Sequence, residues 1–224
     1  DKRTGEFSNN INQQLLEPLS ETLQLDNDCV ARNIVFYVYA ILCSQVYLDE
    51  FEGALFTVNQ SDKRARVPVV ADRDVFMRVV SLGEQLAQLE KADYAPANLL
   101  NFDYEALVSQ IPVGYQLRNT THPFDEENEQ LILTDGRTEI RVDCPMALQT
   151  LNISGYDVVK NVWLKFHSYD FTHCDFNSDD MRNLLNLLNT LEMHTRLVAQ
   201  IDDVVATILN GCIPMIQPNE QQNE

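Results

Sequence analysis

The spacing of apolar residues changes twice along the chain, and this change constrains the fold more than any other feature. Before Asn101 and after Tyr156, apolar residues recur every three or four positions, as on one face of an α-helix. Between these points the apolar runs are short, alternating and β-branched, as in strands. The pattern predicts an α+β fold with a helical N-terminal part, a small, mostly antiparallel sheet and long C-terminal helices.

Five helical segments are predicted around this sheet. They cover residues 12–25 (broken or redirected at Pro18), 34–52, 72–91 and 157–166, and a final helix that starts at 177–180 and is stopped by Gly211 and Pro214. The second segment is apolar on nearly every side, which indicates a buried helix. Its aromatic residues fit either a protein core or a platform on which bases stack: Phe36, Tyr37, Tyr39 and Tyr47.

The extended region contains a hairpin signal. The runs 131–133 and 138–142 are joined through Asp135-Gly136, a turn pair in which Gly tolerates positive φ. Residues 119–129 are polar and predict a mobile loop. The chain organisation expected from these patterns is a helical lead-in (1–29), a body (30–210) and a disordered tail (211–224). The body comprises a helical lobe (30–100), the sheet (101–153) and closing helices (156–210).

Composition limits the class of protein. The chain has 224 residues, 45% of them hydrophobic, which is enough for a sizeable core. No apolar run reaches the roughly 18 residues of a membrane-spanning helix, so no membrane partner is expected. Five widely spaced cysteines without a CxxC pair argue against a disulfide framework and favour a reducing cytoplasm. The start at Asp1, with neither Met nor a signal sequence, suggests a fragment of a longer protein.

The net charge of the chain argues against binding to DNA by bulk electrostatic attraction. Sixteen Lys and Arg against 34 Asp and Glu give a net charge of −18, whereas proteins held to DNA by bulk charge are basic. Within 63–78, five Lys and Arg face only Asp72 and Asp74. This cluster fits either phosphate binding or a solvated loop whose bases pair with neighbouring acids.

The search for catalytic or metal motifs is largely negative. The sequence contains no phosphate-binding glycine loop, no nucleophile elbow and no zinc-protease motif. His167, His173 and Cys174 lie close together but lack a partner set at zinc-site spacing. The segment 175–180 begins like a calcium loop but has Asp180 where the turn needs Gly, so a helix cap is the better interpretation.

Two sequence blocks together resemble a known family. The first comprises 36–47 (FYVYAILCSQVY), Arg66-Val67-Pro68 and 76–89 with its Leu82-Gly83 step; the second comprises 153–165 (ISGYDVVKNVWLK), Thr195 and Ile201-Asp202. Their order and spacing resemble the C-terminal specificity domain of type ISP restriction-modification enzymes. The chain departs from the family pattern at 43–48, where CSQVYL replaces a His-Ser-Pro-Glu-Tyr-Arg series and a basic position is lost.

The resemblance implies a function. Residues 30–210 would be a target-recognition domain that binds double-stranded DNA and has no catalytic centre of its own. The parent enzyme would methylate adenine as part of restriction-modification and phage defence. Its methyltransferase and helicase domains, upstream in the same chain, would hold S-adenosylmethionine and, in members that also translocate and cleave DNA, ATP with Mg²⁺. This segment would hold no cofactor.

Seven basic residues are the DNA-contact candidates: Lys63, Arg64, Arg66, Arg137, Arg141, Lys160 and Lys165. Arg137 and Arg141 are predicted to contact bases, because a two-stranded ribbon fits the major groove and Arg binds guanine with two hydrogen bonds. Their four-residue spacing would place them on one face of a strand. The alternative is that both pair with Asp135, Glu139 or Asp143. At the level of the whole chain, the alternatives are an acidic protein-interaction or DNA-mimicking module and an enzyme whose site has no sequence signature.

Overall fold

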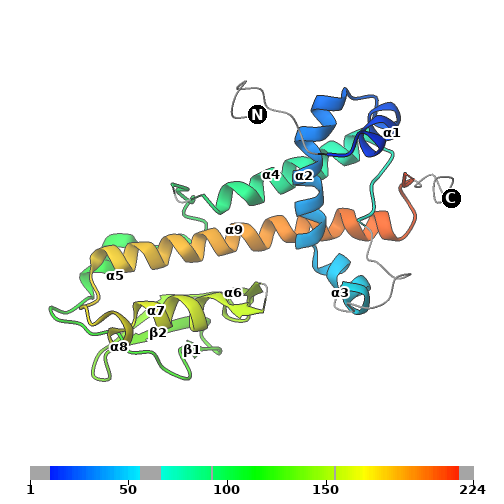
Figure 1. Ribbon diagram of the computed structural model, residues 1–224. Coiled ribbons are helices and arrows are strands. Elements are labelled where there is room, and N and C mark those ends of the chain that lie inside the picture. Colours follow the sequence, from blue (N-terminus) through cyan, green and yellow to red (C-terminus); the bar gives the residue numbers. More distant parts are fainter. Residues whose placement is uncertain (1–10, 56–66, 92, 154, 217–224) are drawn as a thin grey trace. The chain divides into compact units, whose positions relative to one another are not determined.

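The computed structural model (Figure 1) describes residues 11–55, 67–91, 93–153 and 155–216. The chain divides into two compact units. We call residues 1–92 with 196–224 the helical unit and residues 93–195 the sheet unit. Helices dominate the first and a small antiparallel sheet lies in the second, so the predicted α+β class is confirmed. The division into a lead-in, a body and a tail stays a prediction.

The helical unit contains four helices and the end of a fifth. They are α1 (Gln13–Leu23), α2 (Asn27–Cys43), α3 (Gln45–Leu55), α4 (Arg73–Leu89) and the last part of α9 (Ser178–Leu209). Side-chain oxygens of Asn12, Asp26 and Asp72 accept hydrogen bonds from the first backbone amides of α1, α2 and α4. The predicted helix 72–91 is therefore confirmed as α4.

Helices α2 and α4 pack at unusually close range. A Cβ atom added to Gly83 would lie 2.0 Å from the carbonyl oxygen of Phe36, so only glycine allows this approach. Next to it, the rings of Tyr37 and Phe76 stack with centroids 4.8 Å apart. The Tyr37 hydroxyl donates to the Pro68 carbonyl (2.8 Å). Burial raises the pKa of Tyr37, because the buried site disfavours the phenolate.

The predicted helix 34–52 is in fact two helices, bent by 71° at Ser44. The buried Ser44 Oγ donates to Asp202 Oδ1 of α9 (2.6 Å). Asp202 Oδ1 also accepts from the Val46 amide (3.3 Å). The Tyr47 amide in turn donates to Ser44 Oγ (3.2 Å). A carboxylate from a distant helix therefore caps the start of α3 and fixes the bend.

The helix is not broken at Pro18, and of the two interpretations of the aromatic residues the protein core is confirmed. Pro18 lies inside α1 without breaking it; a single missing backbone hydrogen bond is tolerated in a helix that is capped at Asn12 and buries three leucines. The aromatic group does not form a stacking platform, because Tyr37 and Tyr47 are fully buried. Among the described residues no single helix is long and apolar enough to cross a membrane, although α2 and the first part of α3 meet the criterion as a bent pair.

The sheet unit is built on two small antiparallel sheets. Strands β1 (Phe124–Asp125), β2 (Gln130–Thr134) and β3 (Glu139–Asp143) lie in that order, and β4 (Asn152–Ile153) pairs with β5 (Tyr156–Asp157). The remaining elements are α5 (Tyr104–Ser109), α6 (Met146–Gln149), a π-helix η1 (Val158–Leu164), α7 (Lys165–His167), α8 (Tyr169–Thr172) and the first part of α9.

The hairpin predicted around Asp135-Gly136 is confirmed. Strands β2 and β3 pair in register with Ile132 opposite Arg141. Their inward residues, Leu131, Leu133, Ile140 and Val142, are buried in one core cluster with Trp163 of η1 and the leucines of α9. Two sequence expectations need correction: β1 interrupts the predicted loop 119–129, and the predicted helix 157–166 begins as a π-helix capped by Asp157.

Candidate nucleic-acid interface

Four of the seven candidate basic residues lie in the sheet unit, namely Arg137, Arg141, Lys160 and Lys165. Lys63, Arg64 and Arg66 lie outside the described residues. The described candidates therefore lie on the hairpin, on η1 and at the start of α7.

The hairpin turn is held by side-chain hydrogen bonds of its own residues. Asp135 Oδ1 accepts from the amides of Arg137 (2.8 Å) and Thr138 (2.7 Å), and Thr134 Oγ1 accepts from the Gly136 amide (2.9 Å). Gly136 has φ +88°, a value that favours glycine. The hydrogen bonds from the backbone amides of Thr138 and Arg137 stabilise the carboxylate and hold the pKa of Asp135 below its usual value. The turn therefore presents its side chains from a fixed backbone.

Arg137 and Arg141 do not share a strand face, contrary to the sequence expectation. Arg137 lies in the turn before β3 begins, whereas Arg141 is on the exposed face of β3. Arg141 bonds to Asp125 of β1 (2.8 Å) and to Glu139 (3.1 Å). The alternative of pairing with neighbouring acids is thus confirmed for Arg141 with Glu139, and Asp125 joins it because β1 returns beside the hairpin.

Arg118 is a basic residue at the turn that the sequence reasoning missed. Its amide donates to the Thr134 carbonyl (2.8 Å), and its Nε lies 3.7 Å from the position that a Cβ on Gly136 would occupy. Within the described part of the chain, neither the Arg118 nor the Arg137 guanidinium makes a hydrogen bond or an ion pair. We call these two exposed arginines the basic tip.

Lys160 and Lys165 lie on η1 and at the start of α7. Lys160 is half-buried, and its amide donates to Asp157 Oδ1 (2.8 Å). Lys165 is exposed, and its carbonyl accepts from the buried Ser168 hydroxyl (2.8 Å). The four described candidates thus belong to different elements: Arg137 to the hairpin turn, Arg141 to β3, Lys160 to η1 and Lys165 to α7.

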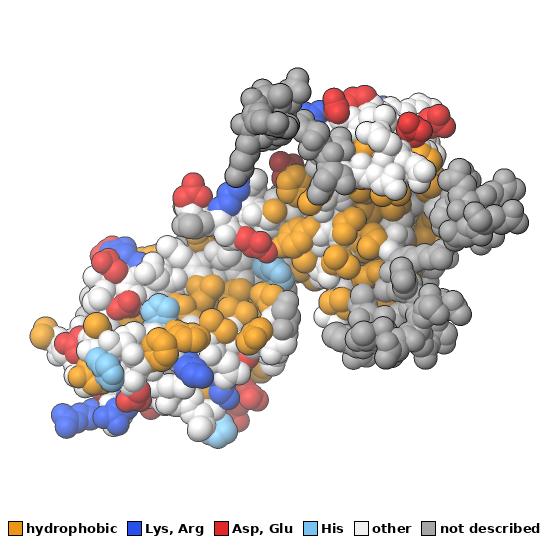
Figure 2. Space-filling view, viewed as in Figure 1, with side chains coloured by type: hydrophobic (Ala, Val, Ile, Leu, Met, Phe, Trp, Pro, Cys, Tyr) orange, Lys and Arg blue, Asp and Glu red, His pale blue; other side chains and the backbone are white. Residues whose placement is uncertain are grey.

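Beside Lys165, two phenylalanines are exposed. Phe166 of α7 is 44% exposed and Phe171 of α8 is 56% exposed. Their rings meet edge to face with centroids 4.7 Å apart. Figure 2 shows hydrophobic and histidine side chains at the surface over α7 and α8. We call Phe166 and Phe171 the phenylalanine pair.

One extended segment connects the phenylalanine pair to the basic tip. Residues 115–118 run between the hairpin and α8: the Arg118 amide donates to Thr134 of β2, and the Leu117 carbonyl accepts from the Tyr169 amide (2.7 Å). The Phe176 amide donates to the Tyr115 carbonyl (2.7 Å). The side chains of Tyr115 and Leu117 are buried. Backbone hydrogen bonds of this segment therefore link the hairpin to α8, the helix that contains Phe171.

His167 and His173, the histidines considered as metal ligands, contact neighbouring aromatic residues in the structure. His167 Nδ1 is 2.9 Å from the Trp163 carbonyl and its ring stacks on Trp163, while His173 packs edge-on against Tyr169. Asn177 Oδ1 accepts from the amides of Asp179 and Asp180 at the start of α9, as expected of a helix cap. No group of three metal-ligating side chains occurs within residues 11–55, 67–91, 93–153 and 155–216.

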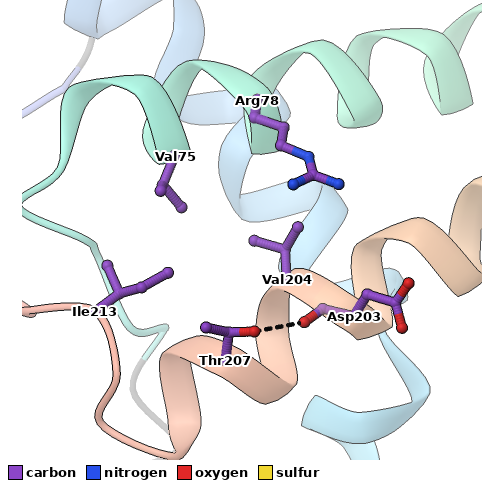
Figure 3. A pocket seen from close by; sticks show the side chains of 6 residues that line it. All are labelled: Val75, Arg78, Asp203, Val204, Thr207 and Ile213. Carbon is purple, nitrogen blue, oxygen red and sulfur yellow. Dashed lines mark hydrogen bonds between the residues drawn. The ribbon is translucent and has the colours of Figure 1, made fainter.

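The helical unit contains a small cavity of about 240 Å³ (Figure 3). Val75 and Arg78 of α4, three residues of α9 (Asp203, Val204 and Thr207) and Ile213 line it. Thr207 Oγ1 donates to the carbonyl of Asp203 in its own helix (2.9 Å). Three of the six lining side chains are aliphatic, the Thr207 hydroxyl is committed to the backbone, and the charged groups of the lining are Arg78 and Asp203.

Comparison with known proteins assigns the family. The model of the type ISP C-terminal specificity domain matches residues 1–193 of the 224-residue chain. No curated protein and no solved structure matches the chain. The match spans both resembling blocks apart from Thr195 and Ile201-Asp202, and it includes the turn, the basic tip and the phenylalanine pair. The chain therefore belongs to the type ISP C-terminal specificity domain family.

Proposed function

We propose that this chain is the DNA sequence-recognition part of a restriction-modification enzyme and that it contacts double-stranded DNA through the basic tip. Family membership supports a DNA-recognition role in restriction enzymes, as part of a larger chain. One structural observation carries the assignment to the tip. In a chain of net charge −18, Arg137 lies on the hydrogen-bonded turn and Arg118 on the segment beside it, and neither guanidinium forms an ion pair among the described residues.

Arg137 is the proposed base contact. It lies at the end of a two-stranded ribbon, a shape that fits the major groove, and guanine O6 and N7 accept two hydrogen bonds from a guanidinium. Arg118 lies at the same turn, on a neighbouring segment, and is proposed to bind phosphate. Arg141 would have to break two ion-pair contacts to reach DNA, so its proposed role is to hold β1 against the hairpin.

The other basic candidates supply phosphate contacts in this proposal. Lys160 and Lys165 lie on elements of the sheet unit, and Lys63, Arg64 and Arg66 belong to the segment 63–78, where five basic residues face two acidic ones. Such contacts give affinity without sequence preference. The acidic remainder of the surface repels DNA that the basic residues do not hold, which lowers nonspecific binding.

The proposal extends to the parent enzyme. The parent methylates adenine with S-adenosylmethionine bound in an upstream domain of the same chain, and a helicase domain there uses ATP and Mg²⁺. The recognition chain holds none of these cofactors and positions the target duplex for them in the cytoplasm. The family match supports this through the class of enzyme in which such specificity domains occur.

The test is selection from a pool of randomised DNA duplexes with the 224-residue chain. The proposal expects one enriched sequence. Arg137→Ala is expected to relax one base position of it, where the discrimination lost is roughly 1–3 kcal/mol. Arg182→Ala is the matched control, because it removes the same charge from an arginine that binds Glu105 (2.6 Å). A wild-type pool without any enriched sequence would refute the proposed function.

A further inference from the structure

We infer that the phenylalanine pair is a stacking surface for a base displaced from the duplex beside the basic tip. This inference rests on the proposed function, because it concerns the same DNA and the same part of the sheet unit. It adds a mode of contact that basic residues cannot supply: Phe166 and Phe171 have no charge and no hydrogen-bonding group, and they interact with bases through their ring faces alone.

The first observation is the exposure of the two rings. Phe166 and Phe171 retain 44% and 56% of their surface in solvent although a large apolar core lies in the same unit. The adjoining aromatic residues of this region, Trp163 and Phe176, are buried in that core and meet edge to face with centroids 6.2 Å apart. Burial of aromatic rings is favourable, so a pair held at the surface is available for a partner.

The second observation is how firmly the pair is held. The rings are 4.7 Å apart and nearly perpendicular (87°), so one ring supports the other. Between their helices, the buried Ser168 bonds back to the Lys165 carbonyl, and its own carbonyl accepts from the amides of Phe171 and Thr172 (both 3.0 Å). Little side-chain entropy is therefore lost when a flat partner stacks on the exposed ring faces.

The third observation is the surrounding charge, which selects the kind of flat partner. Lys165 precedes Phe166 directly, and Arg118 adjoins Leu117, whose carbonyl binds the Tyr169 amide at the start of α8. Asp170 is the acidic residue that lies between the two phenylalanines in sequence. A rigid aromatic pair that is preceded by Lys165, and whose helix α8 is hydrogen-bonded to the segment of Arg118, suits an unpaired base whose phosphates lie at those cations.

Fully paired duplex offers no base face to such a pair, since its bases stack on one another. A base that is mismatched or bulged leaves the stack at a cost of a few kcal/mol or less, and stacking on an aromatic ring offsets that cost. The occupant is therefore an unpaired base within duplex DNA, and the contact requires no change in covalent bonds.

The experiment compares binding of two labelled duplexes of equal length by fluorescence anisotropy at low salt. One is fully paired and the other carries a two-nucleotide bulge that contains 2-aminopurine. We expect roughly tenfold tighter binding of the bulged duplex, from stacking of about one base. In Phe166→Ala and Phe171→Ala this preference should fall toward onefold while binding of the paired duplex stays unchanged. Phe171→Trp should keep the preference, and Val113→Ala, at another exposed apolar residue of the unit, should not alter it.

The outcomes separate the inference from the proposed function. Equal affinity of the wild-type chain for both duplexes overturns the stacking inference alone, and absence of binding to either overturns the proposed function as well. The 2-aminopurine signal tests the wild-type chain independently of whether the alanine variants fold. Stacking on phenylalanine should change its fluorescence on binding, and an unchanged signal in the bound state overturns the inference.

Discussion

The thiol of Cys144 shows how burial controls chemistry at the scale of a single residue. Its side chain is fully buried next to the hairpin, and burial, with a smaller contribution from Glu129, raises its pKa to about 12. Cys174 and Cys212 are exposed. Because the thiolate is the reactive form, the three cysteines should differ sharply in reactivity.

Iodoacetamide at pH 8 is expected to alkylate Cys174 and Cys212 within minutes and to leave Cys144 unmodified in the folded chain. Mass spectrometry of the digested protein measures each site, and the urea-unfolded chain, in which all five cysteines should react, is the control. Modification of native Cys144 at the rate of Cys174 would contradict the buried position.

The same thiol predicts how stability depends on pH. In the unfolded chain Cys144 loses its proton near pH 9, whereas the folded chain keeps the proton to about pH 12. Between these values the folded state binds more protons, so the free energy of unfolding falls as pH rises, and the contribution is fully present below about pH 9. The pKa of Tyr37 and that of Tyr115 are also raised by burial, which extends the loss above pH 10.

Urea unfolding at pH 8, 9, 10 and 10.5 measures this dependence. Above pH 9 the free energy of unfolding should fall less steeply with pH in Cys144→Ala than in the parent chain, by up to about 1.4 kcal/mol per pH unit, whatever the substitution does to stability at pH 8. Cys174→Ala, at an exposed site, should leave the slope unchanged. Identical slopes in Cys144→Ala and the parent chain would exclude the proposed contribution of this thiol.

At the scale of elements, the approach of α2 to α4 depends on Gly83. Gly83→Ala places a methyl group against the backbone of Phe36, which cannot move without separating the helices. Overpacking of this kind costs about 1–3 kcal/mol, and a backbone clash puts Gly83→Ala at the upper end. This exceeds the roughly 1 kcal/mol that alanine gains over glycine in a helix.

The measurement is the free energy of unfolding from urea denaturation. Gly83→Ala should be less stable than the parent chain, and Glu84→Ala, one position along on the exposed face of α4, should lie within about 0.5 kcal/mol of it. A stabilised Gly83→Ala chain would show that the helices are not in close contact there.

Local patterns predict elements well and their junctions poorly. The apolar stripe of α4 and the Asp135-Gly136 turn are signals contained within a few residues, and both elements are found where they were predicted. The bend at Ser44 depends on Asp202, which is 158 residues away. The position of Arg118 at the turn likewise depends on a hydrogen bond from its amide to the Thr134 carbonyl across a loop. No sequence pattern near Arg118 predicts this position.

At the scale of the whole molecule, the resembling blocks and the candidate interface separate. Tyr37, Gly83 and Ser44 belong to the first block, and each maintains helix packing in the helical unit. Arg118 and Arg137 lie outside both blocks and form the basic tip of the sheet unit. These three residues of the first block thus maintain the scaffold, and the proposed basic tip lies between the two blocks in sequence. The proposed phosphate contacts Arg66, Lys160 and Lys165 lie within the blocks.

The strongly acidic chain gives a distinct expectation for DNA affinity. With −18 net charge, bulk attraction is absent, so binding must depend on a few local cations. Each phosphate contact contributes about one unit to the slope of log affinity against log salt concentration. Loss of two contacting arginines should therefore change that slope measurably, whereas loss of two arginines elsewhere should not.

The most direct test is the salt dependence of duplex binding by Arg118→Ala/Arg137→Ala. The control Arg32→Ala/Arg182→Ala removes the same charge from arginines that donate to the backbone carbonyl of Asp28 and to the carboxylate of Glu105. Anisotropy titrations at several salt concentrations should show weaker binding by the tip variant, with a slope smaller by about one unit from the lost phosphate contact of Arg118, and nearly parental behaviour of the control. Equal losses in the two variants, or an unchanged tip variant, would contradict the assignment of DNA binding to the hairpin turn.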